Sequence, residues 1–321
     1  MKRLTIRLAL LIVCALSINT AFAQDANTKE VVKKQTKKKV VPCKWHKANN
    51  FSEGLAAVKN DNGKWGFVDK TGKVVIPCKW NDTWPFFEGL ASVKDTNGKS
   101  GFIDKAGYLV IPCKWDDAGS FSEGMAGVEN SNGKWGFIDK TGQVVIPCQW
   151  GVAGDFYEGI AEVRDANIKY GFIDKTGKIV ISCNWMYASR FSDGLARVID
   201  TNCKCGFIDK TGQLVIPCQW ESAWDSNESL LCVSNAIGKY GFVDKSGNVV
   251  IPCQWKYASS FHEGLAAVKN DNYMWGFIDK TGKVVIPCKW DNTYDFCEGL
   301  AAVRDSNGKW GFIDKTGKVM I

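Results

Sequence analysis

A strict period of 35 residues is the feature that most limits how this chain can fold. Cysteine recurs at this step from Cys43 to Cys288, and glycine recurs from Gly66 to Gly311. Two residues after each cysteine stands a tryptophan, at Trp45, Trp80, Trp115, Trp150, Trp185, Trp220, Trp255 and Trp290. Residues 42–321 therefore divide into eight units of 35 residues without an insertion. Self-similarity at such a fixed period indicates a repeat architecture.

The first unit, residues 42–76, contains a predicted β-hairpin. Leu55–Val58 and Trp65–Asp69 have the composition of short strands, and they flank the pair Asn62-Gly63. An Asn-Gly pair between two such runs predicts a type I′ turn, because both central residues of that turn need positive φ.

A third strand is predicted at Val74–Ile76, after a tight turn around Gly72. Pro77 ends this strand in the prediction, since proline cannot donate to a strand ladder. Residues 77–86 are less regular and lead to the next unit. Each unit is therefore predicted to be a three-strand β-meander.

A unit of this length is too short to fold alone, because domains below about 40 residues need outside help. Neighbouring units are expected to share a core, and the recurring tryptophan is the natural residue to fill it. The sequence thus predicts an all-β tandem array of eight 35-residue three-strand repeats, open, twisted and solenoid-like. The alternative is a closed eight-bladed β-propeller, although propeller blades usually carry four strands.

The repeats resemble those of a known family. Gly63–Asp69 reads Gly-Lys-Trp-Gly-Phe-Val-Asp, and Glu53–Leu55 reads Glu-Gly-Leu. With these motifs, residues 42–321 resemble the WG-repeat (KWG-repeat) proteins of the bacterial exported type. The Trp-Gly pair stands at Trp65-Gly66, Trp135-Gly136, Trp275-Gly276 and Trp310-Gly311, and the tryptophan is replaced in the other units by Ser100, Tyr170, Cys205 and Tyr240. The resemblance implies an interaction module without a common catalytic activity.

Residues 1–23 have the pattern of a secretory signal peptide. A basic start at Lys2 and Arg3 precedes an apolar run over Leu8–Leu16, and the segment ends in Ala21-Phe22-Ala23, which predicts cleavage after Ala23. The alternative is a lipoprotein anchored through Cys14, but Val13 stands where a small residue is usual. No apolar run reaches the roughly 20 residues of a membrane span. We therefore expect a secreted, periplasmic or cell-surface protein.

Residues 24–41 are predicted to be a flexible basic linker. They carry six lysines against Asp25 and Glu30 and contain no aromatic residue, so they cannot bury a core. The alternative is a basic arm that contacts an anionic lipid, wall polymer or nucleic acid. From Pro42 onward there are 32 basic and 32 acidic residues, so the repeats are neutral despite the net charge of +7. A nucleic-acid interface needs a concentrated basic face, and none is indicated.

The residues that could carry chemistry recur in too many copies for one catalytic site. His46 and His262 occupy non-equivalent positions. An aspartate ends each second strand and is expected to bond its own backbone in the following turn, at Asp69, Asp104, Asp139, Asp174, Asp209, Asp244, Asp279 and Asp314. The acidic residue that precedes a recurring glycine is expected to be architectural too, at Glu53, Glu88, Glu123, Glu158, Glu263 and Glu298, with Asp193 in one copy. The loop Asn60–Gly63 resembles a calcium loop but lacks the downstream bidentate glutamate. No catalytic residue, cofactor or metal is predicted.

The eight periodic cysteines are predicted to be small buried hydrophobes rather than disulfides or metal ligands. Equivalent sulfurs in neighbouring units would be about three strand spacings apart, roughly 14 Å, whereas a disulfide needs Cα atoms within about 7 Å. Cys203, Cys205, Cys232 and Cys297 lie outside the period, and Cys203 and Cys205 are close enough in sequence for a local pair.

Taken together, the sequence predicts a non-catalytic array that presents a multivalent surface to a protein or a cell-envelope ligand. The rival hypothesis is a wall-associated or carbohydrate-binding protein that stacks repeated aromatic side chains on sugars.

Overall fold

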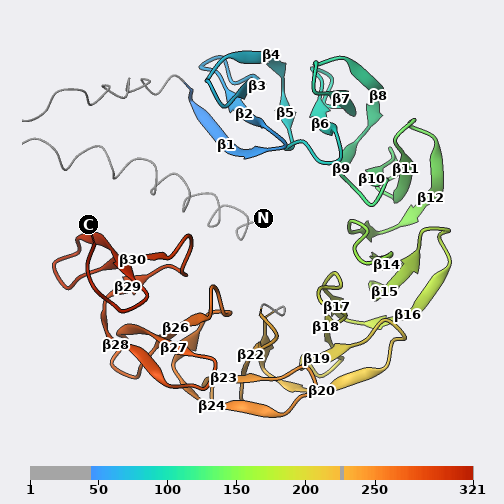
Figure 1. The fold of residues 1–321 in the computed structure, drawn as a ribbon. Coiled ribbons are helices and arrows are strands. Elements are labelled where there is room, and N and C mark those ends of the chain that lie inside the picture. The colour runs from blue at the N-terminus through green and yellow to red at the C-terminus, as the bar shows by residue number, and fades with distance from the viewer. Residues whose placement is uncertain (1–44, 225–227, 321) are drawn as a thin grey trace, which may run out of the picture. The chain divides into compact units, whose positions relative to one another are not determined.

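The computed structural model describes residues 45–224 and 228–320, and this part of the chain consists of β-strands and turns without a helix. The described residues fall into two compact units that divide after Trp115. The strands form eight antiparallel sheets that follow one another along the sequence (Figure 1). The predicted all-β tandem array is confirmed. The predicted signal peptide and linker lie outside the described residues.

The strands of each sheet are ordered as they occur in the chain. In the first unit, the first sheet consists of β1 (Lys47–Ser52), β2 (Leu55–Lys59), β3 (Trp65–Asp69) and β4 (Val74–Trp80), and the second of β5 (Asp82–Thr83), β6 (Leu90–Lys94), β7 (Ser100–Asp104) and β8 (Leu109–Trp115). In the second unit, the third sheet consists of β9 (Asp117–Ser122), β10 (Met125–Glu129), β11 (Trp135–Asp139) and β12 (Val144–Trp150), and the fourth of β13 (Val152–Ala153), β14 (Ile160–Arg164), β15 (Tyr170–Asp174) and β16 (Ile179–Trp185).

The fifth sheet consists of β17 (Tyr187–Ala188), β18 (Ala196–Ile199), β19 (Cys205–Ile208) and β20 (Leu214–Trp220), and the sixth of β21 (Ser222–Ala223), β22 (Leu231–Ser234), β23 (Tyr240–Val243) and β24 (Val249–Trp255). The seventh sheet consists of β25 (Tyr257–Ala258), β26 (Leu265–Lys269), β27 (Trp275–Asp279) and β28 (Val284–Trp290), and the eighth of β29 (Asn292–Thr293), β30 (Leu300–Arg304) and β31 (Trp310–Asp314).

In the four-stranded sheets, the predicted meander gains an additional strand at its start, so its predicted third strand is the last strand of the sheet. That last strand is also longer than predicted. β12 continues through Pro147 to Trp150, because the β11–β12 register shifts between Trp135 and Phe137 and the proline falls in this bulge on an edge strand. The stretch predicted to be irregular contains a two-residue strand, here β13, which pairs with β14. A strand of two residues is too short to show an alternation of apolar and polar side chains, so the sequence did not predict it.

The predicted type I′ turn at the Asn-Gly pair is wrong. In the β10–β11 hairpin, Gly133 N donates to Asn130 O, and Gly133 has a φ of 68° while Asn132 does not have positive φ. This is a type I turn followed by a glycine bulge. Asn130 Oδ1 accepts hydrogen bonds from Asn132 N at 3.0 Å and from Lys134 N at 3.1 Å, and these side-chain bonds favour that turn.

The type I′ turn lies instead at the Glu-Gly pair. Glu158 and Gly159 have φ values of 54° and 89°, and Tyr157 and Ile160 exchange both backbone hydrogen bonds around them. A glutamate held at positive φ is conformationally costly, which calls for a compensating contact.

Within each of the two units, neighbouring sheets share a core, as predicted. Phe137 and Trp150 of the third sheet pack in one cluster with Phe156, Val163 and Ile173 of the fourth sheet. Fully buried phenylalanines dominate these cores in addition to the tryptophan that the sequence suggested. Ring pairs with centroids 4.8–4.9 Å apart recur across sheet boundaries, at Phe67–Phe86, Phe137–Phe156, Phe172–Phe191, Phe242–Phe261 and Phe277–Phe296.

Candidate binding surface

The eight periodic tryptophans belong mainly to the packed interior. Trp80, Trp115, Trp150, Trp220 and Trp290 are buried, while Trp45, Trp185 and Trp255 are half-buried. In addition, the Nζ atoms of Lys79 and Lys114 lie 4.9 and 5.0 Å from the ring centroids of Trp80 and Trp115. The faces of the buried rings are therefore covered by the protein itself and are not presented for stacking on a sugar.

The glycine of the Trp-Gly pair is required by the bulge that faces it. A Cβ atom on Gly136 would lie 2.5 Å from Ile146 O and 2.7 Å from Cys148 N, both of them backbone atoms. Because the glycine has no side chain, the Cys148 thiol can reach across to Val128 O at 3.8 Å. The same contact is made by Cys78, Cys253 and Cys288. The recurring glycine and cysteine thus belong to one structural arrangement.

Each four-stranded sheet places four residues, one from each strand, side by side. In the seventh sheet Tyr257 pairs with Lys269, Lys269 with Trp275, and Trp275 with Trp290. Directly opposed residues point to the same face of a sheet, so their side chains form a line across it. We call these four positions the cross-strand row of the sheet. The tryptophan of the Trp-Gly pair is its third member.

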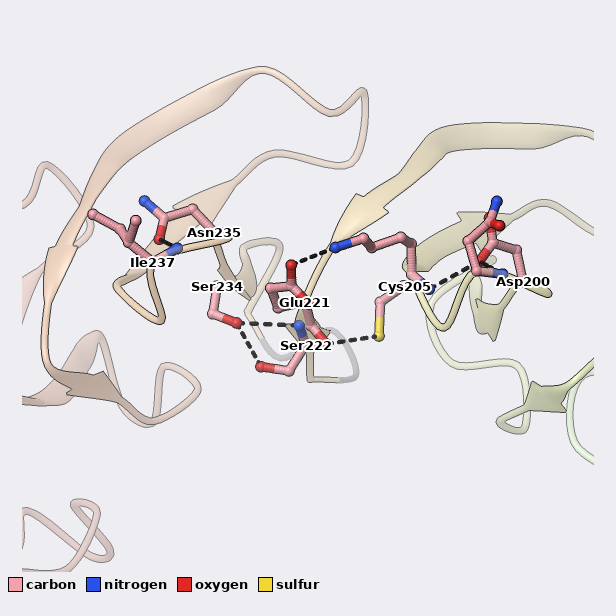
Figure 2. A network of polar contacts seen from close by, with 9 residues as sticks. Asp200, Cys205, Glu221, Ser222, Ser234, Asn235 and Ile237 are labelled. Carbon is pink, nitrogen blue, oxygen red and sulfur yellow. Dashed lines mark hydrogen bonds and ion pairs between the residues drawn. The ribbon is translucent and has the colours of Figure 1, made fainter.

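The first three positions of the row differ from sheet to sheet. The third sheet has Asp117, Glu129 and Trp135, the fourth Val152, Arg164 and Tyr170, the fifth Tyr187, Ile199 and Cys205, and the sixth Ser222, Ser234 and Tyr240. Figure 2 shows that the two hydroxyls of the sixth row, Ser222 Oγ and Ser234 Oγ, are joined by a hydrogen bond of 2.7 Å. The repeated fold is therefore the same in these sheets, whereas the side chains at the first three positions of the row differ in charge, polarity and size.

A second surface recurs in every four-stranded sheet, at the start of its last strand. Val144 and Val145, at the start of edge strand β12, are 42% and 43% exposed. The last strands of the other four-stranded sheets also begin with exposed apolar residues, two in most sheets and one in the fifth and seventh, at Val74 and Val75, Leu109 and Val110, Ile179 and Val180, Leu214, Val249 and Val250, and Val284. We call these residues the apolar pairs. Each lies on a strand whose outer edge has no partner strand in its sheet.

The glutamates of the Glu-Gly turns connect consecutive sheets. Glu158 Oε1 accepts a hydrogen bond from Gly194 N at 3.3 Å, and Lys210 Nζ lies 2.9 Å from Glu158 Oε2 and 3.1 Å from Glu158 O. The Lys210 hydrogen bond lowers the pKa of Glu158, although partial burial acts in the opposite direction. Equivalent ion pairs join Glu53 to Lys105, Glu123 to Lys175, Asp193 to Lys245, Glu228 to Lys280 and Glu263 to Lys315.

Sequence reasoning missed Glu228, since Ser229 replaces the glycine that marks the motif elsewhere. Glu228 nevertheless has a φ of 53° and accepts a hydrogen bond from Gly264 N at 2.9 Å. Its position 35 residues after Asp193 was the signal that could have found it.

The sequence profile described as WG containing repeat matches residues 33–65, 65–99, 101–135, 135–167, 170–200, 206–235, 240–273, 275–310 and 310–321. These matches cover nearly all of the repeats. The chain belongs to the WG-repeat family. No curated protein is similar enough in sequence to count as a relative.

Solved structures similar to this WG-repeat chain have low sequence identity. The computationally designed Ika8 protein is 11% identical, with a TM-score of 0.47 and coverage of 83% of this chain and 94% of the other. BamB from Moraxella catarrhalis is 10% identical, with a TM-score of 0.47 and coverage of 82% and 95%. The WD40 beta propeller domain of Doa1 is 10% identical, with a TM-score of 0.35 and coverage of 72% and 90%.

The aspartates of the WG repeats form turns, as predicted. Asp174 Oδ1 accepts hydrogen bonds from Thr176 N at 2.9 Å, Thr176 Oγ1 at 2.6 Å and Lys178 N at 3.1 Å. The bond from the Thr176 hydroxyl contributes most to the lowered pKa of Asp174. Asp174 is thus held as an ionised turn residue.

One serine, histidine and aspartate do come together, in a grouping that the sequence did not indicate. Ser259 Oγ donates to Asp295 Oδ1 at 2.6 Å, and His262 Nδ1 lies 3.5 Å from Asp295 Oδ2. A catalytic triad needs the imidazole between the hydroxyl and the carboxylate. Here the carboxylate itself holds the hydroxyl, so the arrangement supplies no base to activate Ser259.

Within residues 45–224 and 228–320, no three or more His, Cys, Asp or Glu side chains are grouped to hold a metal ion. None of these residues forms a helix with the length and apolar character of a membrane span.

The Glu158 ion pair predicts an acid-sensitive contribution to stability. Because the folded pKa of Glu158 lies below its ordinary value of 4.5, this contribution is present above about pH 4.5 and is lost as the pH falls through the folded pKa. We expect Glu158→Gln to lower the free energy of unfolding by less than about 1 kcal/mol at pH 7, because both side chains are partly exposed. Urea unfolding of both proteins at pH 7 and at pH 3 measures this change in the free energy of unfolding.

The cost of Glu158→Gln should shrink at pH 3, and a double-mutant cycle with Lys210→Met should show that the two losses are not additive. Additive losses, or a cost independent of pH, would contradict the ion pair.

We predict that the cysteines are thiols. The eleven cysteines among the described residues are thiols in the structure, and burial raises the pKa of the Cys218 thiol to about 11. In the folded protein the exposed Cys203 and Cys297 should react first with a thiol reagent. Under denaturing, non-reducing conditions most of the eleven should titrate. Recovery of only a few thiols would indicate disulfides between repeats.

Proposed function

We propose that the protein is an exported, non-catalytic repeat array that presents a multivalent binding surface to a protein or a cell-envelope ligand. The apolar pairs carry this proposal, because they repeat the same exposed chemistry in sheet after sheet. Apolar side chains that stay exposed in a recurring pattern are typical of interaction sites. Several weak contacts to one repetitive partner would add up, since each bound sheet raises the effective concentration for the next.

The recurring carboxylates support a binding role rather than catalysis. Catalysis needs one preorganised site. The aspartates of the turns are held by backbone amides, and the glutamates of the Glu-Gly turns are paired with lysines of the next sheet. Neither set is placed as an acid and base facing a common cavity. The signal-peptide pattern of residues 1–23 supports export of the protein.

The proposal is tested by removing sheets or apolar pairs and measuring sedimentation with isolated bacterial cell-envelope fractions. Truncations ending at Ile251, Ile181 and Ile111 leave a last sheet of three strands, as in the eighth sheet. Threonine at Val144 and Val145, and then at further apolar pairs, changes the surface without shortening the chain.

A gradual fall of affinity with the number of intact sheets or apolar pairs is expected. Circular dichroism and urea unfolding check that each variant is folded. Loss of all binding on changing one particular sheet, with the fold intact, would show a single site and overturn the multivalent proposal.

Carbohydrate binding is the second candidate function, and the exposed aromatics of the eighth sheet favour it. Trp310 is 43% exposed, and its ring stacks on Tyr294 with centroids 5.2 Å apart and planes at 14°. The buried periodic tryptophans do not contribute to this candidate surface.

A further inference from the structure

Three residues of the cross-strand row of the seventh sheet line an open pocket with a volume of about 390 Å³. Its walls are formed by Lys256, Tyr257, Lys269, Tyr273 and Trp275. A volume of this size lies within the usual range of small-molecule sites, about 300–1,000 Å³. Three aromatic rings and two lysines therefore line one concave site.

The rings form two walls that meet at a steep angle. Tyr257 and Trp275 have ring centroids 5.4 Å apart and planes inclined by 69°. Such a corner does not match the parallel-sided slot that holds a flat base between two rings. The corner suits a ligand ring that is not flat and that has apolar C–H faces, such as a pyranose ring.

Both lysines extend over the aromatic surface. Lys269 Nζ lies 5.3 Å from the ring centroid of Tyr273 and 5.4 Å from that of Trp275, and Lys256 Nζ lies 5.6 Å from the ring of Tyr273. Within the described part of the chain, neither ammonium has a carboxylate within 4.0 Å. The lysines of the Glu-Gly contacts, by contrast, are paired. Among the described residues, the positive charge of this site is thus not paired with a carboxylate.

Tyr273 occupies a position where the fold favours glycine. Its φ is 62°, in the left-handed region, and its side chain is 58% exposed. The equivalent residue is Gly63, Gly98, Gly133, Gly238 or Gly308 in five other repeats. A tyrosine here is strained and gains little from burial, so the core does not explain it. Strain of this kind is characteristic of ligand-binding positions.

We infer that the seventh sheet binds an anionic saccharide, with the carboxylate of a hexuronate residue held by Lys256 and Lys269. The apolar face of the sugar ring packs against Tyr273 and Trp275. Complementary charge and aromatic surface support this ligand class, and the exposed position of Tyr273 allows a polymer to continue beyond the site. The inference names a ligand for the carbohydrate candidate function, but it does not depend on multivalency or on the apolar pairs.

The test uses the full-length protein and a trimer of galacturonic acid, with binding measured by isothermal titration calorimetry. We expect Lys269→Ser, which introduces the residue of the sixth row, to weaken binding about tenfold or more, because a charge-assisted contact is lost. We expect Tyr273→Gly to weaken binding by a similar factor while the protein unfolds at an equal or higher urea concentration. A residue with only a structural role would not combine these two effects.

Ile168→Gly is the matched control. Ile168 stands at the equivalent position of the fourth sheet with the same φ of 62°, so this change relieves the same strain away from the proposed site. Trimer binding should be unchanged. The methyl-esterified trimer, which keeps the sugar rings and lacks the charge, should bind at least tenfold more weakly than the acid.

Equal binding of the ester would overturn the role of the lysines. Equal binding of an oligoglutamate peptide would show an acidic-protein site in place of a saccharide site, and no binding of the acid trimer would also overturn the inference. These results are separate from the proposed function, because graded envelope binding by the apolar-pair variants can hold or fail whatever the trimer does.

Discussion

Gly136→Ala should destabilise the third sheet severely, by at least about 3 kcal/mol in urea unfolding. The added Cβ atom would lie 2.5 Å from Ile146 O, 2.7 Å from Cys148 N and 2.7 Å from Pro147 C. All three are backbone atoms of the bulge in β12, so no flexible side chain can move aside. Relief requires β12 to shift, which would also move Ile146 and Trp150 out of the shared core.

Gly127→Ala is the matched control, because Gly127 lies on the neighbouring strand β10. Its Cβ atom would meet the Trp135 ring at 3.5 Å, an ordinary contact distance. The equivalent residue is alanine at Ala57, Ala267 and Ala302. Gly127→Ala should therefore be neutral or stabilise the protein by up to about 1 kcal/mol. Equal effects of the two changes would show that Gly136 is not confined by the bulge.

Much of the fold could be predicted because eight copies of one unit act as an internal comparison. Positions that hold the same residue in all eight units, such as those of Gly136 and Trp150, revealed the period and the need for a shared core. The strand that follows Trp150 was missed because two residues show no alternation. Pro147 was misread as a strand end, because its bulge depends on the register with β11, which local sequence does not determine.

The turns show the same limit. Asn-Gly is compatible with a type I′ turn, but the Asn130 side chain two residues before that pair stabilises a type I turn with a glycine bulge. Glu158 was assigned an architectural role without its partners, because the contact with Lys210 joins residues 52 positions apart. Such contacts follow from how consecutive sheets pack.

The candidate sites were beyond sequence reasoning for a related reason. Tyr257, Lys269 and Trp275 are spread over 19 residues, and only the strand register brings them into one row. The signal available in the sequence was Tyr273, a bulky residue at a position that is usually glycine. The apolar pairs were visible as strand residues, but their exposure depends on β12 and its equivalents lying at sheet edges.

Trp150→Ala should lower the free energy of unfolding by about 3–5 kcal/mol, the range for deleting a large buried aromatic side chain. Trp150 is 7% exposed and packs in one cluster with Phe137, Ile146 and Phe156. Its removal opens a cavity between the third and fourth sheets. The loss should therefore reach both sheets, and urea unfolding followed by amide hydrogen exchange should show reduced protection in β11 and in β14.

Trp310→Ala provides the comparison, because this tryptophan is 43% exposed and lies in the last sheet. It removes an aromatic ring of the same size but leaves no closed cavity, so its cost should not exceed about 1 kcal/mol. A similar small cost for Trp150→Ala would place that ring on the surface. The periodic tryptophans would then become candidates for stacking on sugars, and carbohydrate binding would become the better account of the whole array.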